Sequence, residues 1–220
     1  MPDPTQFSVA ERRALPVILL ADTSGSMEAD SKIEALNRAV AEMLDALVSD
    51  ADAPAQIQVA VIAFGGTVAT VHLPLQPVEE VRWSPMAARG KTPLGLALQQ
   101  LGVLLGDESQ IPRNAYYPTL VLLSDGQPTD EWRTPLSQLL DSDRGRKTVR
   151  LSVGIGADAD AAVLRAFASD PVNGVLRADQ ARQIHTFFRW LTATIASRTR
   201  AASPNRAPFL APPSLDDIEF

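Results

Sequence analysis

The chain has 220 residues, of which 45% are hydrophobic and 21% are charged, a balance typical of one soluble globular domain with a tail. Its net charge of -6 argues against general nucleic-acid binding, which needs a basic surface to replace phosphate counterions. The absence of cysteine excludes disulfides, thiolate zinc sites and cysteine nucleophiles. Neither a secretory signal nor an apolar run of the roughly 20 residues that span a membrane is found, so we expect a cytoplasmic protein without membrane contact.

The predicted elements begin with an apolar run over residues 15–21. A continuous apolar run of this length predicts a strand that is buried on both faces. The run stops at Asp22-Thr23-Ser24-Gly25-Ser26, so the strand would deliver polar side chains to one edge of a sheet. Residues 32–48 then carry apolar side chains at helical spacing, with charges on the other face, and predict an amphipathic helix.

Two alternating segments, residues 56–64 and 67–75, flank the pair Gly65-Gly66. Glycine readily adopts the positive φ of tight hairpin turns, so this pattern predicts a β-hairpin. Pro74 and Pro77 are expected to end the second strand. Because proline cannot donate to the hydrogen-bond ladder of a sheet, we expect this strand at an edge.

The second half of the chain alternates helices with strands. Thr92-Pro93 predicts a helix start, with Thr92 as the N-cap of a helix over residues 94–105. Residues 118–123 form a second buried apolar run, which ends in Ser124-Asp125-Gly126 and so repeats the pattern of the first strand. The remaining predictions are a helix over residues 136–140, a strand over 148–154, a helix over 160–168, a strand over 175–176 and a helix over 180–198.

This alternation predicts an α/β fold, with a six-stranded, mostly parallel sheet, one antiparallel edge strand and helices on both faces. We expect a leader over residues 1–13, one domain over residues 14–198 and a flexible, proline-containing tail over residues 199–220. The tail ends in the acidic and apolar segment Asp216-Asp217-Ile218-Glu219-Phe220. Two interpretations stay open for this segment. It is either a solvated end, or a segment whose acids or terminal carboxylate bind a neighbouring molecule's metal in self-association or recruit a partner.

Oxygen-bearing side chains occur at three places where a strand ends or a helix begins. They comprise the carboxylates of Asp22 and Asp125 and the hydroxyls of Ser24, Ser26 and Thr92. Each of these residues taken alone is common in turns or at helix caps. Their joint occurrence is more specific, because in an open parallel sheet ligands bind at the carboxyl ends of the strands. A set of hard oxygens without sulfur or imidazole suits Mg²⁺ or Mn²⁺ better than zinc or copper. The five residues therefore predict a metal site.

The pattern Asp22-x-Ser24-x-Ser26, followed by Thr92 and Asp125, resembles the metal-ion-dependent adhesion site (MIDAS) of von Willebrand factor type A (vWA) domains, over residues 14–198. Three further segments resemble the bacterial TerY-like branch, which is associated with tellurium resistance: residues 13–17, 32–37 and 124–130. The resemblance implies a Rossmann-like, doubly wound sheet. It also implies one divalent cation at these five residues, Mg²⁺ with Mn²⁺ or Ca²⁺ as alternatives, ligated directly or through water.

An Mg²⁺ ion held in this way keeps an open position that favours an outside carboxylate. We therefore expect a metal-dependent protein-binding module whose partner supplies an Asp or Glu, and not an enzyme. The TerY-like resemblance implies a scaffold or signalling component of a stress system, with a Ser/Thr kinase and a PP2C-type phosphatase as partners.

Two other functions stay open. The domain could instead be a subunit that partners a metal chelatase or an AAA+ ATPase. A Mg²⁺-dependent phosphoester hydrolase is a minor alternative, because the chain offers no pairing of a nucleophile with a base. Gly90-Lys91-Thr92 mimics the end of a P-loop, yet the required earlier glycine is replaced by Pro85.

Overall fold

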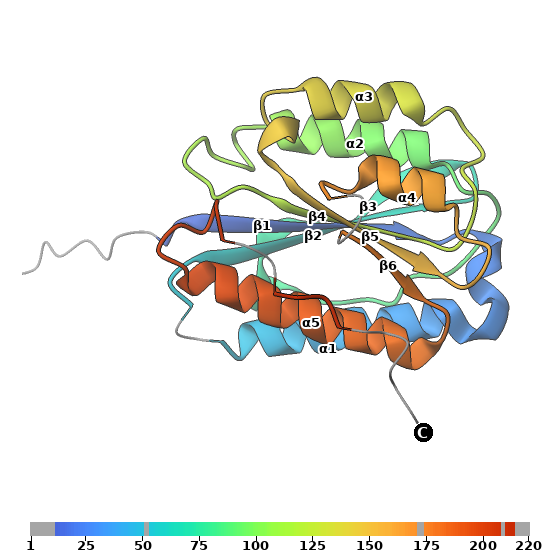
Figure 1. Cartoon of the computed structure of the whole chain (residues 1–220), viewed down its shortest axis with the longest axis horizontal. Coiled ribbons are helices and arrows are strands. Elements are labelled where there is room, and N and C mark those ends of the chain that lie inside the picture. The colour runs from blue at the N-terminus through green and yellow to red at the C-terminus, as the bar shows by residue number, and fades with distance from the viewer. Residues whose placement is uncertain (1–11, 51–52, 171–173, 208–209, 214–220) are drawn as a thin grey trace, which may run out of the picture.

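The centre of the protein is a six-stranded sheet with the strand order β3-β2-β1-β4-β5-β6 (Figure 1). The structure, a computed structural model, describes residues 12–50, 53–170, 174–207 and 210–213. The strands are β1 (Ala14–Asp22), β2 (Gln56–Gly65), β3 (Val68–Pro77), β4 (Thr119–Ser124), β5 (Val149–Ile155) and β6 (Val175–Ala178). The α-helices are α1 (Lys32–Val48), α2 (Leu94–Gly106), α3 (Arg133–Asp141), α4 (Ala161–Phe167) and α5 (Ala181–Arg200).

The sheet is parallel except at one edge. β2, β1, β4, β5 and β6 pair in parallel, and β3 pairs antiparallel with β2. Helices α1 and α5 cover one face, and helices α2, α3 and α4 cover the other (Figure 1). The predicted Rossmann-like α/β fold, with six strands and one antiparallel edge strand, is confirmed.

The central strand β1 shows why a continuous apolar run specifies this position. Val17 and Leu19 belong to the core cluster on the side of α1 and α5, whereas Ile18 and Leu20 belong to the cluster on the side of α2. All four side chains are fully buried. Because successive side chains of a strand point to opposite faces, a strand covered on both sides needs apolar residues at every position.

The hairpin of β2 and β3 forms as predicted, with one correction. β3 continues to Pro77, so Pro74 lies inside the strand and does not end it. The register of β3 against β2 shifts between Val59 and Val61, which leaves Pro74 without a paired residue. An irregularity of this kind at a sheet edge tolerates a residue that has no N–H to donate.

A buried arginine joins the end of α5 to the start of β4. The guanidinium of Arg198 donates to the carbonyl oxygens of Pro204 (3.3 Å) and Tyr117 (3.1 Å) and to the hydroxyl of Thr119. Burial lowers the pKa of Arg198 to about 10, so the group stays charged at neutral pH. The backbone N–H of Tyr117 also donates to Asn205 Oδ1 (2.7 Å). Residues 204 and 205 of the predicted tail therefore contact the domain.

Two predicted segments lie largely or wholly outside the described residues. These are the leader over residues 1–13, of which residues 12 and 13 are described, and the acidic end over residues 216–220. None of the helices in the described ranges is long and apolar enough to cross a membrane.

The substitution Arg198→Ala should lower the free energy of unfolding by about 3 kcal/mol, because it leaves buried carbonyl groups without donors. For a chain of this size the melting temperature should fall by about 10 °C, measurable by circular dichroism. Arg189→Ala, at an exposed position of the same helix, should change the free energy by less than about 0.5 kcal/mol. Equal losses in the two variants would contradict this role for Arg198.

Candidate metal centre

The candidate site lies where the chain leaves the centre of the sheet. β1 and β4 are parallel neighbours, and their carboxyl ends carry Asp22 and Ser124, with Asp125 next in the chain. The strand order reverses direction between β1 and β4, since β2 and β3 lie on one side and β5 and β6 on the other. Crevices at such switch points are where open α/β sheets bind ligands.

Asp22 is a fully buried carboxylate. Its Oδ1 accepts a hydrogen bond from the backbone N–H of Ser24 (2.8 Å), and its Oδ2 accepts one from the hydroxyl of Ser124 (2.6 Å). Burial raises the pKa of Asp22 above its ordinary value of 3.8, because the ionised form loses its hydration, although these hydrogen bonds act in the opposite direction. The hydrogen bonds of the protein therefore compensate the cost of burying this carboxylate only in part.

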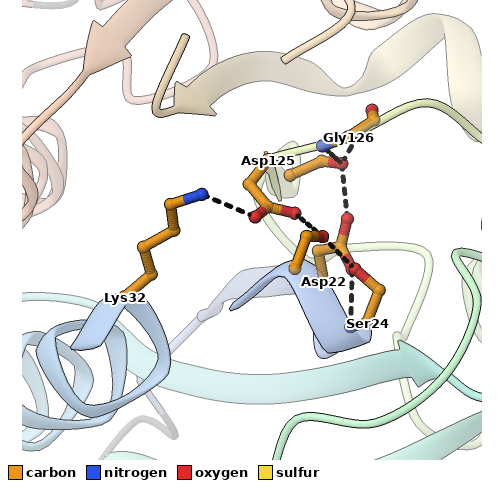
Figure 2. Close-up of polar contacts among 7 residues, drawn as sticks. Asp22, Ser24, Lys32, Asp125 and Gly126 are labelled. Carbon is orange, nitrogen blue, oxygen red and sulfur yellow. Dashed lines mark hydrogen bonds and ion pairs between the residues drawn. The ribbon is translucent and has the colours of Figure 1, made fainter. Parts of the chain in front are cut away.

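A chain of hydrogen bonds links the remaining residues of the two strand ends (Figure 2). The hydroxyls of Ser24 and Ser26 lie 2.9 Å apart, and the Ser26 hydroxyl donates to Asp125 Oδ1 (2.6 Å). The other oxygen of this carboxylate, Asp125 Oδ2, accepts from Lys32 Nζ (2.9 Å). The Asp125 side chain is fully buried, and that of Lys32 is 15% exposed. Asp125 is thus paired with an internal cation.

Thr92 reaches the same place from a third segment. A methyl group added to Gly126 would lie 3.8 Å from Ser26 Oγ and 3.9 Å from Thr92 Oγ1, so both hydroxyls border one point beside the backbone of Gly126. The Thr92 backbone also exchanges hydrogen bonds with Thr129, at 3.2 Å and 2.9 Å. The structure therefore brings all five side chains named from the sequence to one edge of the sheet.

The predicted role of Thr92 as an N-cap is wrong. Helix α2 begins at Leu94, and no side-chain hydrogen bond comes from the cap position. The carboxylate of Asp130 caps the helix instead, accepting from the backbone N–H groups of Gly95 (2.9 Å) and Leu96 (3.0 Å). A carboxylate at a helix N-terminus is favoured by both hydrogen bonding and the helix dipole, and it leaves the Thr92 hydroxyl available to the site.

Sequence reasoning missed the roles of Lys32 and Ser124. Lys32 is the first residue of α1, where a positive charge opposes the helix dipole. A lysine in this unfavourable position is a signal that a carboxylate lies nearby. Ser124 ends the second buried strand directly before Asp125. A hydroxyl next to a carboxylate at the end of a strand also occurs after the first strand, and this repetition could have indicated that Ser124 belongs to the site.

The donor set fits a hard divalent cation. Among the described residues, no group of three or more His, Cys, Asp or Glu side chains comes together as a metal cluster. The site instead combines two buried carboxylates with hydroxyls, and the charge of Lys32 offsets part of the negative charge. Oxygen donors of this kind suit Mg²⁺, Mn²⁺ or Ca²⁺.

Comparison with known proteins gives a family match. The family profile described as von Willebrand factor type A domain matches residues 17–190. No curated protein matches the chain.

Solved structures share the fold. They include proximal thread matrix protein 1 from the mussel byssus with a zinc-occupied MIDAS motif (18% identity, TM-score 0.60, covering 84% of this chain and 46% of that one). The pilus adhesin SpaC from Lactobacillus rhamnosus GG matches with 15% identity and a TM-score of 0.68 (86% and 31%). A von Willebrand factor type A protein from Catenulispora acidiphila matches with 24% identity and a TM-score of 0.63 (84% and 42%). The chain thus spans less than half of each of these proteins, and the likeness concerns the fold.

The substitution Asp22→Asn should stabilise the metal-free protein at neutral pH. Because the folded-state pKa of Asp22 is raised, the stability that protonation provides is present at low pH and is lost as the pH rises through the folded-state pKa. Asparagine removes this loss, so the free energy of unfolding at pH 7 should be higher than that of the wild type.

The measurement is denaturant unfolding in excess chelator at acidic and neutral pH. The exposed Asp143→Asn is the control and should show no such gain. A lower stability of Asp22→Asn at pH 7 would count against the proposed cost of this buried charge.

Proposed function

We propose the function of this chain from one premise: it belongs to the von Willebrand factor type A domain family. The chain acts as a metal-dependent protein-binding module and not as an enzyme. One observation supports this proposal above the others: two fully buried carboxylates and three hydroxyls, from segments far apart in the sequence, meet at the switch point of the sheet. Fold alone does not imply function, so the proposal depends on these side chains.

The five residues Asp22, Ser24, Ser26, Thr92 and Asp125 hold one divalent cation, directly or through water. Mg²⁺ is the proposed ion, with Mn²⁺ or Ca²⁺ as alternatives, because the donors are hard oxygens. The zinc-occupied MIDAS motif of the mussel protein supports a divalent ion at this place in the fold. When bound, the ion supplies a positive centre that attracts an outside carboxylate.

Charge balance supports an acidic ligand. Two carboxylates line the site and Lys32 compensates one of them, so a bound divalent ion leaves the site with a net positive charge. An Asp or Glu of a protein partner is the ligand that this charge favours. The carboxylates of the chain therefore do not neutralise the ion fully, and the remaining positive charge is available to a partner's acid.

The biological setting is proposed from the TerY-like resemblance of residues 13–17, 32–37 and 124–130. It comprises a cytoplasmic scaffold or signalling role in a tellurium-resistance or stress system, with a Ser/Thr kinase and a PP2C-type phosphatase as partners. Two of these segments contain residues with a structural role in this chain, since Lys32 pairs with Asp125 and Asp130 caps α2. Residues 14–198 remain the proposed domain, within which the family match runs over residues 17–190.

The first test is Mg²⁺ binding by isothermal titration calorimetry. Ser26→Ala should weaken binding by about tenfold, which corresponds to ~1.4 kcal/mol, because it removes a hydroxyl that bridges to Asp125. Ser137→Ala, at an exposed serine of α3, is the matched control and should bind like the wild type. Partner capture in pull-downs should disappear with chelator and with Ser26→Ala. No binding heat in the wild type, or capture that persists in chelator, would refute the proposal.

A second test concerns Lys32. Replacing its ammonium group with a neutral amide in Lys32→Gln should tighten Mg²⁺ binding by about tenfold, since the cation no longer competes for Asp125. The same variant should be less stable than the wild type in chelator, because Asp125 is then buried without a counter-charge.

The matched control for this test is Lys91→Gln, an exposed lysine beside Thr92 that should change neither property. Unchanged Mg²⁺ affinity in Lys32→Gln, measured by the same calorimetry, would show that Lys32 does not tune the site.

A further inference from the structure

An exposed apolar surface lies at the edge of the sheet, on β3 and α2. In the described part of the chain six large apolar side chains are strongly exposed, and four of them gather here: Val68 (43%), Val71 (52%), Leu96 (38%) and Val103 (74%). They line a groove of about 600 Å³ between the strand and the helix. We call these four residues and the groove between them the edge patch.

The edge patch has no charge. Neither the 10 residues of β3 nor the 13 residues of α2 include an Asp, Glu, Lys or Arg, although 21% of the chain is charged. Natural proteins commonly protect edge strands with charged side chains, because an open edge invites pairing with another molecule. β3 carries Pro74 and a register shift, which also protect an edge, but no charge protects the patch, and the helix beside the strand is equally free of charge.

We propose that the edge patch is the contact between two copies of this chain. Two copies that each carry a net charge of -6 repel each other, and an uncharged face is where that repulsion is weakest. The same lack of charge gives an unlike partner no electrostatic pattern to recognise. A two-fold contact, in contrast, requires only that one surface complements itself, and an apolar edge satisfies this requirement.

Gln100 is a polar side chain that lines the same groove. Its amide Nε2 donates to the backbone oxygen of Ala69 on β3 (2.5 Å). Its Oε1 is buried and has no hydrogen-bond partner among the described residues. A buried acceptor without a donor is costly, but this atom is closed off within the single chain, so the proposed contact depends on the apolar side chains of the patch.

The test is sedimentation velocity of the full chain over micromolar concentrations, with chelator present so that no metal contact contributes. The wild type should form a dimer. Val103→Glu should raise the dimer dissociation constant at least tenfold, because it places a charge in an apolar contact. Val103 is 74% exposed in the monomer, so the variant should keep its melting temperature. Val71→Lys, on the strand side of the patch, should have the same effect.

Val48→Glu is the matched control, since Val48 is 43% exposed at the end of α1 and outside the patch, and its dimer should equal that of the wild type. A wild type that stays monomeric at all concentrations overturns the proposal and leaves an unlike partner as the occupant. A dimer that both patch variants leave intact overturns it as well. Because the measurement is made in chelator, neither outcome bears on the metal site.

Discussion

The burial of Asp22 is the constraint on which the carboxyl edge of the sheet depends. A carboxylate without exposure is costly unless donors replace its hydration, and both donors come from fixed places: the backbone of Ser24 and the hydroxyl of Ser124. The first lies in the loop after β1 and the second at the end of β4. The same charge therefore sets the path of the loop and the alignment of two strand ends. Its raised pKa shows that these bonds offset the burial only in part.

The loop after β4 places two parts of the site at once. It begins with Asp125, and it continues to Asp130, whose carboxylate caps the helix that follows Thr92. Between them, Thr129 exchanges backbone and side-chain hydrogen bonds with Thr92. The positions of Asp125 and Thr92 are consequently set by one short segment, and neither residue can shift far without disturbing the start of α2. A preorganised site of this kind limits the entropy lost on binding an ion.

Local patterns predicted the elements, and tertiary contacts decided what they could not. Continuous apolar runs identified β1 and β4, because a strand that is covered on both faces carries apolar residues at every position. The capping of α2 was missed because Asp130 lies 37 residues beyond Pro93, the cap position, and a local sequence pattern cannot indicate a contact between residues so far apart. The exposure of Val103 was missed for a related reason. An apolar helix is expected to be buried, and only the strand order shows that α2 lies beside an edge.

The candidate metal site and the edge patch differ in chemistry, but both are connected to the hairpin turn at Gly66. Gly66 in the hairpin turn, with φ of 71°, donates its N–H to Arg89 O (2.6 Å) and accepts from the N–H of Lys91 (3.2 Å). β3 begins two residues after this glycine, and Thr92 follows Lys91 directly. A side chain at Gly90 would come within 2.7 Å of Gly66 Cα, so close approach requires glycine there. Any displacement of the edge strand at this turn must therefore move the Thr92 loop or break these bonds.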